Sequence, residues 1–159
     1  GSRPSRRPGQ HYRVLAGLAR AWNAHRVVEV GTYLGGSALA MLDVPSVERL
    51  VTYDLVPWDQ FPKSMFRADD FGIRLEQWIR NLGEREVFAV ERDELVQADM
   101  IFVDASKDEE FEAKFLAALF ATDPKSPQLI VLDDIRVLTM IRVWRDIPHD
   151  KFDLTSFGN

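Results

Sequence analysis

One short segment near the N-terminus limits what this chain can fold into more than any other. The apolar run Arg26–Val30 leads into a turn with glycines at 31, 35 and 36, and residues typical of a helix begin at Ser37. Glycine at such a turn lets the backbone approach a ligand closely, and the helix that follows offers N–H groups without intrahelical partners. The segment therefore predicts a ligand-binding turn between a parallel strand and a helix.

The spacing of the glycines separates three kinds of nucleotide-binding turn. From Gly31 to Gly36 they follow G-x-x-x-G-G, which lacks the second glycine of the dinucleotide pattern G-x-G-x-x-G. A phosphate-binding loop needs a lysine where Ser37 stands, and Glu29 at the strand end would repel a polyphosphate. A nicotinamide-dependent dehydrogenase and a P-loop protein are both disfavoured.

What remains is a pattern formed by Glu29, Gly31, Tyr33, Gly35 and Ser37. It reads E-x-G-x-Y-x-G-x-S and resembles motif I of the class I S-adenosylmethionine (SAM) methyltransferases, in the catechol O-methyltransferase-like branch. The resemblance implies that the five residues bind SAM, with Glu29 accepting backbone N–H bonds of the turn and favouring the cationic amino end. Tyr33 and Ser37 would contact the methionine carboxylate, although Ser37 is equally well explained as a residue of the first helical turn.

Length and composition set the outer bounds. The 159 residues are 46% hydrophobic, which fits one domain, expected at 11–159 after a flexible tail, 1–10, that starts with an expression-tag remnant. No cysteine is present, so disulfides and thiolate metal sites are excluded. The net charge of −5 makes nucleic acid an unexpected partner, and no long apolar run or signal peptide is recognisable. We expect a cytoplasmic protein that does not bind membranes.

Hydrophobic periodicity predicts an α/β fold. Strands are expected at Arg26–Val30, Arg49–Tyr53, Glu86–Val90, Asp99–Val103 and Gln128–Leu132, and helices at 11–24, 37–42, 65–82, 107–121 and 135–147. This alternation predicts a Rossmann-like, doubly wound, mostly parallel sheet of order 3-2-1-4-5 with helices on both faces. One irregularity is that 91–98 is too short for an ordinary crossover helix between the third and fourth strands.

The C-terminal end departs from the family pattern. Class I domains normally finish with a hairpin of two strands, whereas only Phe152–Phe157 looks like a strand here. We therefore expect an incomplete hairpin, with the end missing, or with another chain completing the sheet, or with an exposed edge prone to self-pairing. A homo-oligomer follows as one expectation.

Acidic residues follow four of the expected strands: Glu29, Asp54, Asp104 and the pair Asp133-Asp134. The carboxyl ends of parallel strands meet at one crevice, so these side chains should gather there. Asp54 lies 23 positions after Gly31, close to the spacing at which an acid binds ribose hydroxyls in nucleotide sites. The alternative is that Asp54 caps the next loop.

The same resemblance extends to the segments after the fourth and fifth strands. Asp104 to Asp108 reads D-x-x-K-D, and Asp133-Asp134 stands where the family has Asp-Asn. This implies that Asp104, Asp133 and Asp134 bind a divalent metal, with Mg²⁺ favoured by three hard oxygen donors, and that Lys107 is the general base. The plain alternatives are that Lys107 is solvated and that the two aspartates cap the following helix.

Two further sets of residues complete the expected site. Asp93, placed just past the expected third strand, would contact the adenine. Trp58, Phe61, Met65 and Phe66 would form either a lid or part of the core.

We therefore expect a SAM-dependent methyltransferase that transfers a methyl group to a hydroxyl of a small molecule, with or without a metal. A catalytically idle SAM-fold module that serves in binding or assembly is the alternative. Nothing in the sequence identifies the acceptor.

Overall fold

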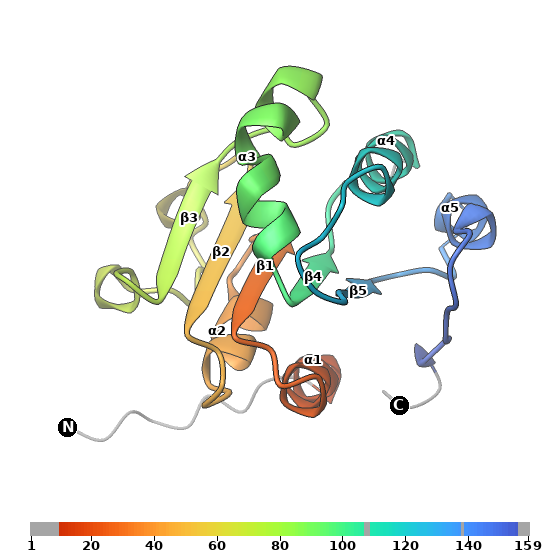
Figure 1. The fold of residues 1–159 in the computed structure, drawn as a ribbon. Coiled ribbons are helices and arrows are strands. Elements are labelled where there is room, and N and C mark those ends of the chain that lie inside the picture. Colours follow the sequence, from red (N-terminus) through yellow and green to blue (C-terminus); the bar gives the residue numbers. More distant parts are fainter. Residues whose placement is uncertain (1–9, 107–108, 138, 156–159) are drawn as a thin grey trace.

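The molecule is built on one parallel sheet, seen in a computed structural model that describes residues 10–106, 109–137 and 139–155 (Figure 1). The strands are β1 Arg26–Val30, β2 Arg49–Asp54, β3 Leu75–Ile79, β4 Met100–Val103 and β5 Leu129–Leu132. They lie in the order β3-β2-β1-β4-β5, and every pair is parallel. The expected fold class and strand order are confirmed.

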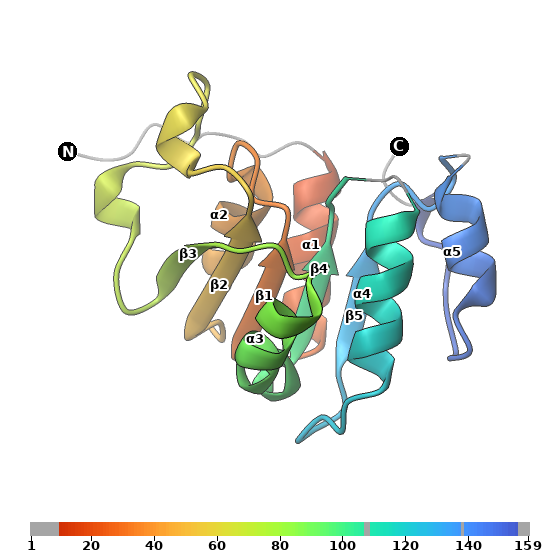
Figure 2. The ribbon, with the colours of Figure 1, turned by 90° about the horizontal axis from the view of Figure 1, so that it is seen from above.

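Helices cover both faces of the sheet, as the view from above shows (Figure 2). They are α1 Gln10–Ala21, α2 Gly36–Leu42, α3 Arg85–Gln97, α4 Glu110–Phe120 and α5 Met140–Asp146. Alternate residues of β1 face opposite layers, so that Val27 packs in the core beneath α1 and α2, and Val28 in the core beneath α3 and α4. A strand buried on both faces needs a mostly apolar sequence, and β1 has one in its three valines, with Glu29 as the buried exception.

The third strand and the helix beside it were assigned wrongly from the sequence. Glu86–Val90 belongs to α3, and the strand is Leu75–Ile79, inside the segment 65–82 that was expected to be helical. Leu75–Ile79 is an edge strand on which only Leu75 is buried, so its sequence, LEQWI, carries no strict alternation. As a result, the crossover from β3 to β4 holds a helix of 13 residues and is not shortened.

The connection from β2 to β3 contains no α-helix. It holds two short 3-10 helices, η1 Trp58–Gln60 and η2 Ala68–Asp70. Aromatic rings take the place of a helix: Trp58 stacks on Phe71 with centroids 5.2 Å apart, and Phe66 lies 5.0 Å from Phe71. Phe66 is only 4% exposed in the core beside α2, so Trp58 and Phe66 pack in this layer, as the core alternative expected.

The last part of the chain differs from expectation in two places. The helix expected from residue 135 begins only at Met140, after a turn closed by Val137 N–H donating to the Asp134 carbonyl. No strand is formed at 152–155, and the rest of the expected sixth strand lies outside the described residues. β5 is half-buried along its whole length, whereas β4 is fully buried.

Within the described residues, no helix is both long and apolar enough to cross a membrane.

Candidate functional site

The turn after β1 has a backbone that only glycine accommodates readily. Gly31 and Gly35 have φ angles of 102° and 80°, in the left-handed region. A Cβ at position 31 would lie 1.9 Å from the backbone carbonyl oxygen of Asp104. The missing side chain therefore lets the end of β4 lie directly against the turn.

Asp54, at the end of β2, binds this turn. Its Oδ2 accepts hydrogen bonds from the backbone N–H groups of Thr32 and Tyr33, both at 2.9 Å. Its Oδ1 accepts from the backbone N–H groups of Leu55 at 2.7 Å and Val56 at 3.2 Å. A carboxylate has about four acceptor positions, so the backbone uses all of them here. Asp54 both holds the turn and caps the loop that follows β2.

Beneath the turn lies a buried set of hydroxyl and carboxyl groups. Glu29 is fully buried and accepts hydrogen bonds from Ser37 Oγ and, at 2.6 Å, from Thr52 Oγ1. Thr52 Oγ1 also lies 2.7 Å from Thr32 Oγ1. This network joins β1, β2, the turn and α2. Glu29 thus binds side-chain hydroxyls rather than the expected backbone N–H groups, and the Ser37 hydroxyl is directed toward Glu29.

Burial changes the charge of Glu29. Its pKa is raised to about 8, mainly by loss of solvent; the hydrogen bonds from Ser37 and Thr52 oppose the rise, and the charges of Asp104 and Asp54 add to it. At neutral pH the side chain is therefore mostly protonated. Glu29 in this state holds the turn without adding a negative charge beneath it.

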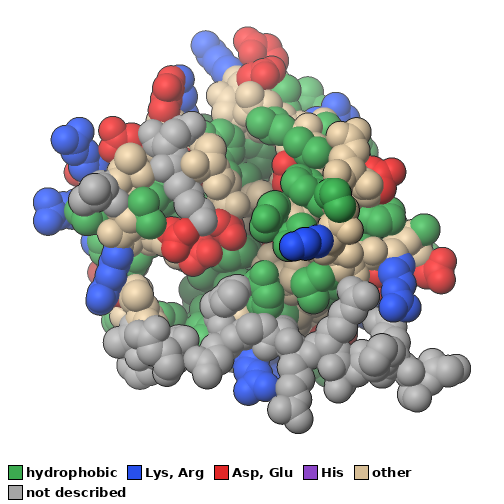
Figure 3. Space-filling model, turned by 180° about the vertical axis from the view of Figure 1, so that it is seen from behind, with side chains coloured by type: hydrophobic (Ala, Val, Ile, Leu, Met, Phe, Trp, Pro, Cys, Tyr) green, Lys and Arg blue, Asp and Glu red, His purple; other side chains and the backbone are tan. Residues whose placement is uncertain are grey.

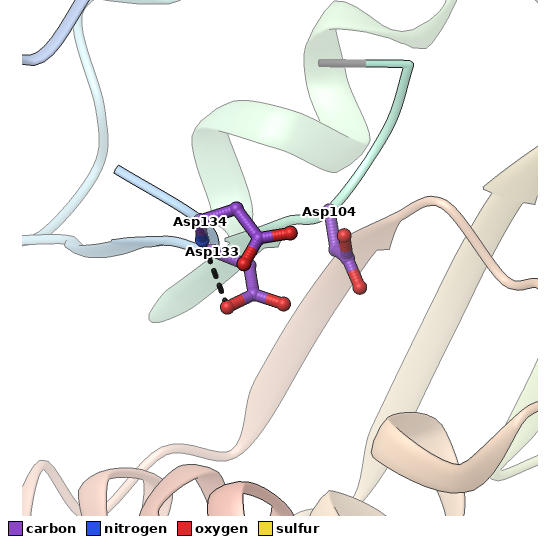
Figure 4. Close-up of side chains that lie close together, drawn as sticks. All are labelled: Asp104, Asp133 and Asp134. Carbon is purple, nitrogen blue, oxygen red and sulfur yellow. Dashed lines mark hydrogen bonds between the residues drawn. The ribbon is translucent and has the colours of Figure 1, made fainter. Parts of the chain in front are cut away.

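Three aspartates converge at the ends of β4 and β5, as Figure 4 shows. Asp104, Asp133 and Asp134 each offer a carboxylate oxygen, and these oxygens lie within 4.8 Å of one another. Asp134 has a φ of 51°, and its N–H donates to Asp133 Oδ1 at 2.9 Å. Since α5 begins only at Met140, the aspartates do not cap it. Three oxygen donors at this spacing suit a hard divalent cation such as Mg²⁺.

The other residues that the sequence predicts for the site lie in different surroundings. Tyr33 is 63% exposed, and its ring meets Phe61 edge-on with centroids 5.5 Å apart. Asp93 lies on the exposed side of α3, where its carbonyl accepts from Gln97 Nε2, so its expected place just past the third strand is wrong. Lys107 lies outside the described residues.

Sequence reasoning missed Tyr12 of α1. Its ring lies so close to Gly36 that a Cβ at position 36 would be 2.7 Å from Tyr12 Cε2 and 2.9 Å from its hydroxyl oxygen. The signal available was helical spacing, because Tyr12 precedes the buried Leu15 and Ala19 by three and seven positions. The same spacing is typical of ordinary core residues.

Comparison with known proteins gives structural but not sequence relatives. No protein-family model matches the chain, and no curated protein matches it by sequence. Among solved structures, the SAH-bound methyltransferase PaMTH1 of Podospora anserina has a TM-score of 0.59 and 22% identity, covering 79% of this chain and 52% of its own. SAH is S-adenosylhomocysteine.

Two further structures give similar values. The O-methyltransferase TomG of Streptomyces achromogenes, involved in tomaymycin synthesis and in complex with SAM, has a TM-score of 0.57 and 24% identity, covering 89% of this chain and 61% of its own. MycE, from the mycinamycin biosynthetic pathway and in complex with Mg and SAH, has a TM-score of 0.54 and 20% identity. The match covers 79% of this chain and 34% of the MycE chain.

These similarities establish the architecture. The chain has the fold of class I SAM-dependent methyltransferases, and it spans about half to three fifths of the length of PaMTH1 and TomG.

Proposed function

We propose that this chain, with its class I SAM-dependent methyltransferase fold, binds SAM and transfers the methyl group to a hydroxyl of a small molecule with the help of a divalent metal. The observation that carries the proposal is a juxtaposition. The turn held by Asp54 and the cluster of three aspartates both lie at the carboxyl ends of the parallel strands, where the Asp104 carbonyl contacts Gly31. SAM bound in the turn and a methyl acceptor bound at the three aspartates would be neighbours.

The turn supports SAM binding through its place at the carboxyl end of β1 and through its neighbouring acid. The amino-acid part of SAM would lie against residues 31–36, where the left-handed Gly31 and Gly35 give the backbone a tight bend. Asp54 would bind the ribose by exchanging the N–H groups of Leu55 and Val56 for two hydroxyls. This exchange involves Oδ1 and the exposed start of the loop, while Oδ2 continues to hold the turn.

The aspartate cluster supports a metal-assisted reaction. Asp104, Asp133 and Asp134 would hold the ion, and one ion would offset the repulsion of three close carboxylates. A bound divalent cation lowers the pKa of an acceptor hydroxyl and orients it. The magnesium present in the MycE structure belongs to that protein and motivates the choice of ion to test here.

Methyl transfer from SAM is a direct displacement. The acceptor oxygen attacks the methyl carbon, the carbon–sulfur bond breaks, and SAH leaves. The hydroxyl proton passes to Lys107, a role that still rests on the D-x-x-K-D motif alone. Alignment of SAM and the acceptor hydroxyl at the carboxyl ends of neighbouring strands would supply much of the rate enhancement.

Calorimetric titration with SAM, SAH and a nicotinamide nucleotide tests the first step. We expect binding of SAM and SAH only, and lack of SAM binding by the folded protein would refute the proposal. The second step is release of SAH in the presence of catechols, sugars and other hydroxyl compounds, with Mg²⁺ or with EDTA.

SAM binding without transfer to any acceptor would favour an idle binding module. From the sequence, a shortened crossover after the third strand and a missing last strand favoured that alternative. The first of these grounds is removed, because the crossover from β3 to β4 contains a full helix.

A further inference from the structure

The side chain of Tyr12 lies against the glycine turn. It comes from α1, more than twenty positions before Gly36 in the chain, yet its ring and hydroxyl both lie against the Gly36 backbone. Any larger residue at position 36 would have to displace the ring. The contact therefore fixes Tyr12 next to the segment where the amino-acid part of SAM is expected.

The hydroxyl of Tyr12 is in negatively charged surroundings. Burial, followed by the negative charge of Asp104 and also that of Asp133, raises its pKa, so the phenol stays protonated at physiological pH. Its neighbours come from three elements: Asp104 follows β4, Asp133 follows β5, and Tyr33 lies in the turn. The negative charges that act on the hydroxyl favour a cation over an anion beside it. The amino-acid part of SAM has an ammonium group, which is such a cation.

We propose that Tyr12 is a cofactor-binding residue that holds the ammonium group of SAM through its hydroxyl oxygen and its ring, beside the glycine turn. This inference rests on the proposed function, because it assigns a further contact to the same cofactor. The hydroxyl oxygen accepts a hydrogen bond from the ammonium, and the electron-rich ring face attracts the same positive charge.

The proposal predicts which ligands depend on Tyr12. SAM and SAH both carry the amino-acid part with its ammonium group, whereas 5′-methylthioadenosine retains the adenosine and the sulfur but lacks it. Removal of Tyr12 should therefore weaken SAM and SAH to the same extent and leave the affinity for 5′-methylthioadenosine unchanged.

The test is calorimetric titration of the full chain with these three ligands. We expect Tyr12→Phe to weaken SAM and SAH by about 12- to 150-fold, the range for one hydrogen bond to a charged group, and Tyr12→Ala to weaken them by more. Arg13→Ala is the matched control, because Arg13 is the next residue of α1 and is exposed. Thermal unfolding of each variant checks that the fold is intact, and Tyr12→Phe decides the question if Tyr12→Ala does not fold.

Failure of the two proposals can be told apart. If the wild-type chain does not bind SAM, the proposed function fails, and this inference fails with it. If the wild type binds SAM and folded Tyr12→Phe and Tyr12→Ala bind it equally well, only the role of Tyr12 is overturned. Equal weakening of 5′-methylthioadenosine, or weakening of SAM with SAH unaffected, would also overturn the assignment to the ammonium group.

Discussion

The carboxylate of Asp54 accepts a hydrogen bond from the backbone N–H of Tyr33 at 2.9 Å, which joins the end of β2 to the turn after β1. Tyr33 has a φ of 43°, a conformation that costs energy for a residue with a side chain. The hydrogen bond holds this residue in place. The expected ribose-binding acid therefore has a structural role as well.

Replacement of Asp54 by alanine should affect stability and ligand binding together. Four backbone N–H groups would lose their acceptor, and we expect a loss of about 1–3 kcal/mol in the free energy of unfolding, with SAM binding weakened at least tenfold. Urea denaturation and calorimetry measure the two effects. Asp59→Ala, at an exposed acid of η1, serves as the control. Unchanged SAM affinity in Asp54→Ala would remove Asp54 from the site.

The close approach between the turn and β4 makes a second prediction. Gly31→Ala would place a methyl group 1.9 Å from the Asp104 carbonyl oxygen at a φ of 102°, and we expect a loss of at least about 2 kcal/mol in stability. Gly17→Ala is the matched control, because a Cβ there meets nothing within 4 Å and the position is inside α1. That change should stabilise the chain by up to about 1 kcal/mol. Equal unfolding midpoints for the two variants would contradict the contact.

The central strands could be predicted from sequence because their environment is uniform. β1, β2 and β4 are buried on both faces, and a buried strand is mostly apolar, so its bounds could be predicted to within a residue even though Glu29 and Thr52 interrupt the apolar pattern. β3 lies at an edge, where Glu76 pairs with Arg49 and Trp78 is partly exposed. The residues of β3 suit a few specific contacts, so they do not follow a regular spacing that could be recognised in the sequence.

The site divides in a similar way. Asp104 and Asp133 could be placed because each directly follows a predicted strand, whereas Asp93 depended on a strand that was assigned wrongly. Tyr12 could not be identified, because its place beside the glycine turn depends on how α1 packs against Gly36. A contact between two segments that lie far apart in the chain produces no pattern that could be recognised in the sequence of either segment.

The buried Glu29 predicts a pH-dependent stability. Its pKa is about 8 in the folded chain against an ordinary value of 4.5, so the folded state keeps a proton that the unfolded state has lost between these values. The stabilisation is complete below pH 4.5 and is lost as the pH rises to about 8, at up to ~1.4 kcal/mol per pH unit.

Glu29→Gln isolates this contribution, since glutamine resembles the protonated acid. The free energy of unfolding should fall more steeply between pH 6 and 8 in the wild type than in the variant, as urea denaturation at several pH values would show. Parallel pH profiles would mean that Glu29 is ionised in the folded chain. Glu86→Gln, at an exposed glutamate of α3, should retain the wild-type profile.

The aspartate cluster predicts a titratable metal site. Mn²⁺, which has similar ligand preferences to Mg²⁺ and is detected by electron paramagnetic resonance, should bind the wild type with one equivalent and be displaced by excess Mg²⁺. Asp133→Asn should weaken Mn²⁺ at least tenfold, because it removes one of three carboxylates. Asp150→Asn, an exposed acid after α5, should not. Equal affinity in both variants would exclude the cluster as the site.

A double-mutant cycle tests the packing of Tyr12 on Gly36 without any ligand. In the wild-type background, Gly36→Ala puts a methyl group 2.7 Å from the Tyr12 ring, and we expect a lower unfolding midpoint. In the Tyr12→Ala background this obstacle is gone, and the same change should stabilise α2 by up to about 1 kcal/mol through helix propensity. The coupling between the two positions should then be about 0.5–3 kcal/mol. Additive effects would show that the ring of Tyr12 does not lie on Gly36 in solution.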